Sequence, residues 1–521
     1  MHESLCFDAQ GARFDDLPHG RARTSTRIRW RESSLVTLWA EFFQLTSLLD
    51  GLDPRLVVGW MSRAQSQVFR TLRGYRASRR FDRRPCRQIR RVSDMSDYSA
   101  KSIKPARISL YGNFGAGNLG NECTLQAVIE QILQRWPDAQ LLCFCTNPQD
   151  VQTRHNIAAF PSEAVNRIAT ERSGSNVRWG QFTRIFRIIF QRIPLEVVHW
   201  IKCLSAVGRS DMLIVAGTGI IADYMCGPLG WPYDIFKLSM LASLCRIKLV
   251  FLSVGAGPIC HPLSRWFLKR SLAVAHHRSY RDEASKRCLE EIGFNTDCDI
   301  VCPDVVFGLL QANLISGARA NKGRIVGLGL KDYGATERLK PEKFREYLET
   351  MAAFVSWLLG RGYDVRLLIG DVRYDGWVIE EFVDLLKRQN IPTGAPRLIA
   401  EPAASVKELL RQIGETEAVI SPRYHNLVIA LIQNKPVIAL SDHAKLDSLV
   451  TDFGLAQYRV SLAGLSARGL IDKFKQLEDN LEQLIPYIKA GSDKYRRAVD
   501  VQYVTILPGP NSAGRTAEAL S

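Results

Sequence analysis

The chain has 521 residues, of which 46% are apolar, and it carries a formal net charge of +16. This length predicts two to four domains. No run of 18 or more apolar residues is present, which excludes a predicted membrane-spanning helix. The 12 cysteines contain no Cys-x-x-Cys pair and share no metal-ligand spacing with the nine histidines, which favours a reduced, cytoplasmic protein without a metal centre.

The first hundred residues differ in composition from everything that follows. They hold 18 arginines and no lysine, with a net charge of +7, whereas residues 101–521 carry a net charge of only +9. We therefore expect residues 1–100 to be a separate extension, and residues 1–94 to be translated upstream sequence if the native start is Met95. The alternative is a basic arm for RNA or lipid headgroups. No RNA-binding module is recognisable, so nucleic acid is not the expected partner.

A regular alternation of strands and helices begins near residue 106. Strands are predicted at 108–111, 141–144, 212–216, 248–254 and 279–281, with helical segments between them and a less regular region at 148–210. Such alternation is typical of a parallel sheet covered by helices. Residues 101–315 are thus predicted to form an N-terminal Rossmann-like lobe.

A second α/β unit follows a predicted linker at 313–322. Its strands are expected at 325–330, 365–369, 418–421 and 437–440, and its helices at 341–360, 375–389, 405–415 and 426–434. We predict a C-terminal Rossmann-like lobe at 316–460, a helical segment at 461–500 that packs back on both lobes, and a polar tail at 501–521. The predicted fold class is α/β, with two parallel sheets.

One basic and aromatic stretch, Phe182–Arg192, has the pattern of an amphipathic helix. An ordinary surface helix packed on the sheet accounts for this pattern. A contact with a membrane surface is the other interpretation. It would place the protein at the inner face of the membrane and would suit a lipid-linked substrate.

Glycine-rich turns follow two of the predicted strands. In the first, Gly115, Gly117 and Gly120 have the spacing of a dinucleotide fingerprint, but no acidic residue ends the next strand, so a nicotinamide cofactor is not expected. Glycines let backbone N–H groups approach a ligand closely, although a tight structural turn needs them equally. The second turn contains Gly217 and Gly219. Asp223, beyond it, would orient a sugar hydroxyl or cap a helix.

Cationic side chains follow three other predicted strands. Arg281 ends one strand, Arg423 and His425 lie between a strand and a helix, and Lys445 follows the next strand in the same lobe. Arginine binds carboxylate or phosphate through two parallel hydrogen bonds, and histidine moves protons near neutral pH. Ligands of open α/β sheets bind at this edge. The pattern indicates chemistry on a small anionic substrate, or else solvated surface cations and a capping His425.

Taken in order, these motifs resemble the polysaccharide pyruvyl transferase family. The matching segments are Gly112–Glu122, Ala216–Gly219, Arg281–Ser285, Arg423–His425 and Lys445. Asn121 and Thr218 depart from the residues usual in the family, which bears on the acceptor side of the site. The resemblance covers residues 106–460. It implies two lobes similar to GT-B glycosyltransferases, a site in the cleft between them, phosphoenolpyruvate as donor and a pair of sugar hydroxyls on a surface or exported glycan as acceptor.

The resemblance also implies roles for individual residues. Arg423, Arg281 and Lys445 would bind the donor, and His425, as imidazolium, would protonate its methylene carbon, yielding a cyclic pyruvate ketal and phosphate without a metal or cofactor. The acceptor or its backbone cradle would be formed by Gly115, Gly117, Asn118, Gly120, Glu122, Gly217, Gly219 and Asp223. Two alternatives remain: a GT-B glycosyltransferase with a nucleotide-sugar donor, and a basic RNA- or membrane-binding protein without catalysis.

Overall fold

The structure is a computed structural model that describes residues 106–164, 193–224, 226–310, 324–333 and 341–508. The chain divides after Ser99, and everything described here belongs to the unit that begins at Ala100. Three predicted segments lie outside the described residues: the extension 1–100, the stretch Phe182–Arg192 and the linker 313–322. Of the predicted tail 501–521, residues 509–521 also lie outside them, whereas residues 501–506 are not tail but the end of a long helix that begins at Leu481.

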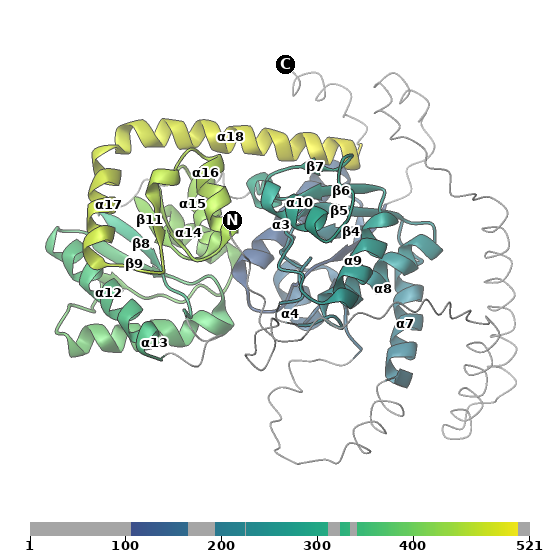
Figure 1. The fold of residues 1–521 in the computed structure, drawn as a ribbon, viewed down its shortest axis with the longest axis horizontal. Coiled ribbons are helices and arrows are strands. Elements are labelled where there is room, and N and C mark those ends of the chain that lie inside the picture. Colours follow the sequence, from purple (N-terminus) through teal and green to yellow (C-terminus); the bar gives the residue numbers. More distant parts are fainter. Residues whose placement is uncertain (1–105, 165–192, 225, 311–323, 334–340, 509–521) are drawn as a thin grey trace, which may run out of the picture. The chain divides into compact units, whose positions relative to one another are not determined.

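The first lobe is built on a sheet of seven parallel strands in the order β3-β2-β1-β4-β5-β6-β7 (Figure 1). Its elements in chain order are β1 (Arg107–Tyr111), α3 (Leu119–Arg135), β2 (Gln140–Cys145), α4 (Pro148–His155), β3 (Ala158–Pro161), α7 (Ile193–Val207), β4 (Met212–Ala216), α8 (Trp231–Leu244), β5 (Lys248–Val254), α9 (Pro262–Ala273), β6 (His277–Tyr280), α10 (Glu283–Glu291), β7 (Ile300–Val301) and the 3-10 helix η3 (Val305–Gly308).

The second lobe contains six parallel strands in the order β10-β9-β8-β11-β12-β13. Its elements are β8 (Ile325–Gly329), α12 (Pro341–Gly360), β9 (Asp364–Leu368), α13 (Val372–Arg388), β10 (Leu398–Ile399), α14 (Val406–Gly414), β11 (Ala418–Ser421), α15 (Tyr424–Ile432), β12 (Val437–Ser441), α16 (Ala444–Asp452), the 3-10 helix η4 (Ala456–Tyr458) and β13 (Arg459–Ser461). Two further helices follow, α17 (Ala467–Asp479) and α18 (Leu481–Ile506).

The two sheets share one topology, and this confirms the predicted fold class. In each, the third and second strands lie on one side of the first, and the fourth to sixth lie on the other, which is the strand order of Rossmann-like sheets. The order reverses between β1 and β4 in the first lobe and between β8 and β11 in the second. Loops that leave the carboxyl ends of strands at such a reversal enclose ligand sites in this architecture.

The hydrophobic core explains why the strands are so uniformly apolar. Every residue of β4 is buried, as expected for a central strand with helices on both faces. One core cluster lies over the first sheet and continues without interruption into the second lobe, and a second cluster fills the other face of the first sheet. Helix α15 contacts α3, η3 and α18, so it belongs to the part of the core that both lobes share.

Helix α18, yellow in Figure 1, is bonded to both lobes. The Ser492 hydroxyl donates to the Leu431 carbonyl of the second lobe at 2.6 Å. Further along the helix, the Gln502 amide donates to Ser279 Oγ of the first lobe at 2.9 Å. Asp500 forms an ion pair with Arg135 on α3. The helix therefore links the two lobes, and in the first lobe Gln502 binds near the carboxyl end of β6.

The region 148–210 is more regular than its sequence predicts. Instead of irregular structure, its described part contains α4, β3 and α7. Strand β3 has only four residues, two of them half-buried, so its alternation of polar and apolar residues is too short to recognise. The strand predicted at 279–281 begins two residues earlier, at His277. No helix among the described residues combines the length and the apolar character needed to cross a membrane.

Candidate functional site

The glycine-rich turn after β1 is bonded to the loop that follows β9 in the other lobe. The Leu119 amide donates to the Gly370 carbonyl at 3.1 Å, and the Val372 amide donates to the Gly117 carbonyl at 2.9 Å. Between these bonds, Asn118 Nδ2 donates to Asp371 Oδ2 at 3.1 Å. The carboxyl ends of the two sheets therefore face each other, and the predicted cradle residues Gly117 and Asn118 lie where the lobes meet.

The interior of this turn is held by Glu122, whose carboxylate is fully buried. Its Oε1 accepts the Gly115 amide at 2.8 Å, and its Oε2 lies 2.9 Å from His155 Nε2. Gly115 has a φ of +71°, and a Cβ there would lie 2.5 Å from the Asn147 carbonyl oxygen, so only glycine fits. Glu122 and Gly115 thus shape the turn, and the Glu122 oxygens are already engaged within the protein.

Gly120 is the direct contact between the turn and the Arg-x-His motif. A Cβ at this position would lie 2.7 Å from the His425 Cβ and closer still to the ring atoms Cγ and Nδ1. Gly120 is in the first turn of α3, and His425 is in the first turn of α15. The absence of a side chain at position 120 therefore fixes where the imidazole can lie.

A methyl group at position 120 would push the His425 imidazole out of place. If His425 takes part in catalysis, we predict that Gly120→Ala lowers the turnover number of the protein's reaction by roughly 10²-fold, because displacing a reacting group by about 1 Å has that effect. Gly360→Ala is the matched control, since a Cβ at the end of α12 meets no atom within 4 Å. Steady-state kinetics of both variants check the prediction. Equal activity in the two would show that His425 tolerates displacement.

His425 is a mostly buried imidazole, with 15% of its side chain exposed. Its Nε2 finds no hydrogen-bond partner among the described residues and lies 3.7 Å from Asp304 Oδ2. Burial, together with the positive charges of Arg281 and Lys445, lowers its pKa to about 3. The positive end of the α3 dipole acts in the same direction. The imidazolium expected from the sequence is therefore not the form that this environment favours.

Arg281 is buried among partners that the sequence analysis did not assign to it. Its guanidinium lies 3.4 Å from Asp282 Oδ2 and 3.5 Å from Asp304 Oδ2, and it stacks on the Tyr424 ring with 4.5 Å to the centroid. Asp282 also caps α10 by accepting the Ser285 amide at 2.7 Å, as acidic residues at helix starts commonly do. The protein itself thus supplies carboxylates to the Arg281 guanidinium.

Arg423 is held in place by the second lobe. Its Nη2 bonds to Asp375, which is fully buried, and its side chain is 26% exposed. Asp375 is itself fixed because Oδ2 accepts the Gly370 and Asp371 amides. A Cβ at Gly370 would lie 2.6 Å from Arg423 Cγ, so this glycine leaves room for the arginine.

Two lysines add positive charge near the carboxyl ends of the strands in the second lobe, where Arg423 also lies. Burial and the charges of Arg281, Arg423 and Lys331 lower the pKa of Lys445 to about 8, and no carboxylate of the described residues forms an ion pair with it. Lys331, which follows β8, pairs with Asp442. An ammonium group that is buried among other cations favours the binding of an anion.

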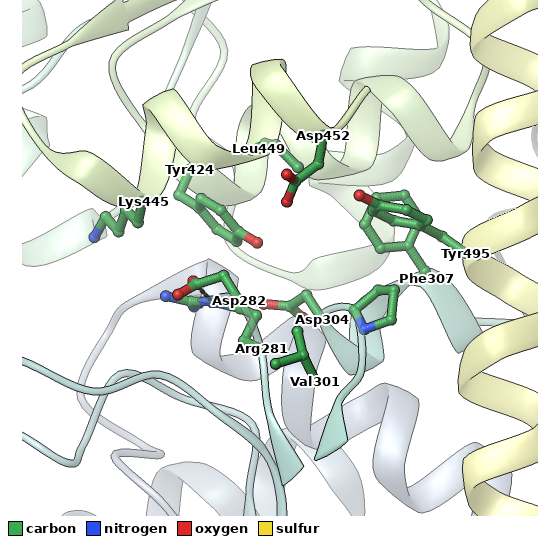
Figure 2. Close-up of a pocket in the computed structure, with 11 residues that line it drawn as sticks. Arg281, Asp282, Val301, Asp304, Phe307, Tyr424, Lys445, Leu449, Asp452 and Tyr495 are labelled. Carbon is green, nitrogen blue, oxygen red and sulfur yellow. Dashed lines mark hydrogen bonds and ion pairs between the residues drawn. The ribbon is translucent and has the colours of Figure 1, made fainter. Parts of the chain in front are cut away.

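Figure 2 shows a small cavity below Tyr424, with a volume of about 60 Å³. Its polar lining is formed by Arg281, Asp282, Asp304, Tyr424, Lys445, Asp452 and Tyr495. Three of these residues are carboxylates, and the Lys445 amine points away from Asp452 and Asp304. With three carboxylates in its lining, this cavity is unsuited to an anionic ligand.

In the turn after β4, Gly217 is closely packed, whereas Gly219 has free space around it. A Cβ at Gly217 would lie 3.1 Å from Val305 Cγ2, whereas at Gly219 it would meet nothing within 4 Å, so Gly219 borders open space. The Asp223 carboxylate accepts the Cys260 amide at 2.9 Å and the His261 amide at 2.8 Å. Asp223 therefore braces a loop, which matches its structural interpretation rather than a role toward a sugar hydroxyl.

Sequence reasoning missed the acidic partners of the cations. Asp304 and Asp375 hold His425, Arg281 and Arg423, yet neither belongs to a recognisable motif. Lys331 could have been predicted as a further cation of the site, because it follows the end of a strand as Lys445 does. Within the described residues, no group of three or more His, Cys, Asp or Glu side chains is arranged to hold a metal ion.

Comparison with known proteins gives one family and several likenesses of fold. The chain is similar to S. aureus MnaA in its structure with UDP (12% identity, 77% of this chain and 96% of that one, TM-score 0.46) and to UDP-GlcNAc 2-epimerase from Neisseria meningitidis bound to UDP-GlcNAc (13%, 78% and 100%, 0.45). It is also similar to a glycosyltransferase from Rickettsia africae (10%, 78% and 98%, 0.47). No curated protein matches the chain.

The family is settled by a match over residues 118–443 to the sequence model described as polysaccharide pyruvyl transferase. This span is more than half of the chain and includes four of the five motifs wholly or in part. It begins within the first glycine-rich turn and stops two residues before Lys445. The chain belongs to the polysaccharide pyruvyl transferase family.

Proposed function

We propose that this protein transfers the pyruvyl group of phosphoenolpyruvate to two hydroxyls of one saccharide. Two C–O bonds form at the central carbon of the donor, and its bond to the phosphate oxygen breaks. One hydroxyl proton ends on the methylene carbon, which becomes a methyl group, and the other leaves with hydrogen phosphate. The product is a cyclic ketal that keeps the carboxylate.

The observation that supports this proposal best is the convergence of cationic side chains from both lobes. Arg281 belongs to the first lobe, whereas Arg423, Lys445 and Lys331 belong to the second. After burial, the positive charges of Arg281, Arg423 and Lys331 lower the pKa of Lys445. Phosphoenolpyruvate carries a carboxylate and a phosphate. Its binding would neutralise charges that repel one another in the protein alone.

The proton must pass through a group that exists in both protonation states, and His425 is placed for this. The neutral ring can accept a hydroxyl proton, and Asp304, 3.7 Å from Nε2, would stabilise the imidazolium that results. An anionic donor next to Arg281 and Lys445 would offset the two charges that depress the His425 pKa. We therefore assign the acid step to the donor complex, not to the free protein.

The proposal is tested with the purified full-length chain. Isothermal calorimetry with phosphoenolpyruvate should show binding, and UDP-GlcNAc and other nucleotide sugars should show none. In the presence of a saccharide acceptor, mass spectrometry should detect an added pyruvate less one water, with release of one phosphate. Tight binding of a nucleotide sugar together with glycosyl transfer would replace the proposal with its main rival.

Lys445 gives the proposal a pH signature. Its pKa of about 8 means that it is charged below that pH and neutral above it. We expect the affinity for phosphoenolpyruvate to fall about tenfold between roughly pH 7 and pH 9.5, when a charge-assisted contact is lost. Lys445→Arg should remove this fall, because an arginine stays charged throughout. Calorimetry across the pH range measures both.

The variant Lys445→Met separates binding from folding. Since the folded-state pKa of Lys445 lies below its ordinary value, the buried charge destabilises the fold at neutral pH, and this cost is relieved only as pH rises above 8. Lys445→Met should thus unfold at a higher temperature, by about 1–3 kcal/mol of stability, while its donor affinity is lower than that of wild type below about pH 8 and approaches it above that pH. Unchanged donor affinity would remove Lys445 from the site.

A further inference from the structure

Helix α7 has an exposed face that is apolar at its start and basic at its end. Leu195, Val198 and Ile201 are 50%, 48% and 41% exposed. Lys202 and Arg209 are exposed as well. Residues 195, 198, 202 and 205 are spaced by three or four positions, so their side chains share one face of the helix. The aliphatic and the basic side chains thus form one continuous surface.

The opposite side of α7 is fixed in the first lobe. Val207 is fully buried in the core, and Trp200 Nε1 donates to the Tyr233 hydroxyl of α8 at 2.8 Å. His199 Nε2 lies 3.0 Å from the Pro161 carbonyl oxygen at the end of β3. The exposed aliphatic side chains therefore belong to an anchored helix and not to a frayed one.

A groove of about 720 Å³ adjoins the basic end of this face. It is lined by apolar side chains of the strands, among them Leu142 and Phe160, and by the basic residues Arg107, Lys202 and Arg209. None of the described residues that line it is acidic. Since Arg107 is the first residue of β1, the groove lies toward the amino ends of the strands and away from the candidate functional site.

The positive charge of this surface is not neutralised by the protein. Within the part of the chain that the structure describes, Arg107, Lys202 and Arg209 form no ion pair. The acidic residue of α7, Glu196, is engaged by α8, because its Oε1 accepts Lys237 Nζ at 3.1 Å. Aliphatic groups next to unpaired cations suit a partner that is apolar and negatively charged at once.

We propose that the exposed face of α7 and the adjoining groove bind a membrane surface that contains anionic phospholipids. The three aliphatic side chains enter the boundary between headgroups and acyl chains, and the three basic side chains bind lipid phosphates. A second copy of the chain fits less well, because a symmetric contact would place the same cations opposite one another. This inference does not depend on the reaction that the protein catalyses.

Vesicle flotation with the full-length chain tests the proposal. Wild type should float with an equal mixture of phosphatidylcholine and phosphatidylglycerol, and much less with phosphatidylcholine alone. Lys202→Gln/Arg209→Gln should lower the partition coefficient roughly 10-fold, because two cations near an anionic surface are lost. Leu195→Ser/Val198→Ser should lower it by about the same factor, because less apolar area enters the membrane.

The matched control is Lys387→Gln/Arg388→Gln, which removes the same charge from α13 in the other lobe. These two side chains are 60% and 59% exposed. Vesicle binding by this variant should equal that of wild type. The control also accounts for the basic residues 1–100, which every protein in the comparison contains.

Three results would overturn the proposal. Equal losses in the two charge variants would assign vesicle binding to net charge rather than to α7. Equal binding to neutral and mixed vesicles would exclude recognition of lipid phosphate. A wild-type protein that does not float would exclude the membrane as partner, and a dimer in analytical ultracentrifugation that Leu195→Ser/Val198→Ser dissociates would then identify a second copy as the occupant. Thermal unfolding of each variant shows whether the fold is kept, and the charge variant decides if the apolar one is unfolded.

Discussion

His425→Ala should lower the turnover number for pyruvyl transfer by about 10²–10⁴-fold, the usual contribution of a positioned acid or base. Donor affinity should stay within about twofold of wild type, because a neutral imidazole adds no charge with which to bind an anion. The fold should persist, since the ring of His425 is 15% exposed and Nε2 makes no hydrogen bond within the described part of the chain. Single-turnover kinetics and calorimetry measure the two effects separately.

The matched control for this experiment is His276→Asn. His276 precedes β6, at the amino end of that strand and thus at the opposite edge of the sheet, and its Nδ1 accepts the Leu249 amide at 3.1 Å. An asparagine can keep that bond, so turnover should be unchanged. A His425→Ala protein with near-normal turnover would end the catalytic role of His425, and the proton would then have to pass through another group.

The fold could be predicted from the sequence because its central strands are apolar runs separated by helices. Strands β4 and β5 match their predicted ranges residue for residue, and so does α12. The short strands at the sheet edges could not be predicted. Strands β7 and β10 have two residues each, which is below the length at which any periodicity exists. Their places in the sheets are determined by neighbouring strands and not by their own sequences.

The candidate site was predictable in its cations and unpredictable in their partners. Arg423 lies two residues after β11 and Lys445 lies four residues after β12, and ligands of open α/β sheets bind at these strand ends, so both positions could be identified without coordinates. Asp304 and Asp375 are distant in sequence from the cations that they hold. The neutral state of His425 depends on burial by α3 and on two charges from different lobes. These features arise only when the two sheets are brought together.

Arg281→Ala should have the largest combined effect of any single change in the site. It would leave Asp282 and Asp304, both buried, without their cation. Removing one partner of a buried ion pair costs about 3–5 kcal/mol of stability. Donor affinity should fall roughly 10- to 100-fold, the range for a lost hydrogen bond to a charged group. Chemical denaturation and calorimetry with phosphoenolpyruvate measure these two losses.

Stability and donor binding can be separated because a second arginine, Arg278, lies three residues before Arg281 and also pairs with a buried carboxylate. Arg278 on β6 bonds to the buried Asp299 at 2.7 Å, so Arg278→Ala should destabilise the protein in the same way while leaving donor affinity intact. Conversely, Asp304→Asn added to Arg281→Ala removes the uncompensated charge and should restore part of the stability but none of the affinity. If the double variant recovers donor binding, Arg281 acts only through the fold, and the cationic donor site must be rebuilt around Arg423 and Lys445.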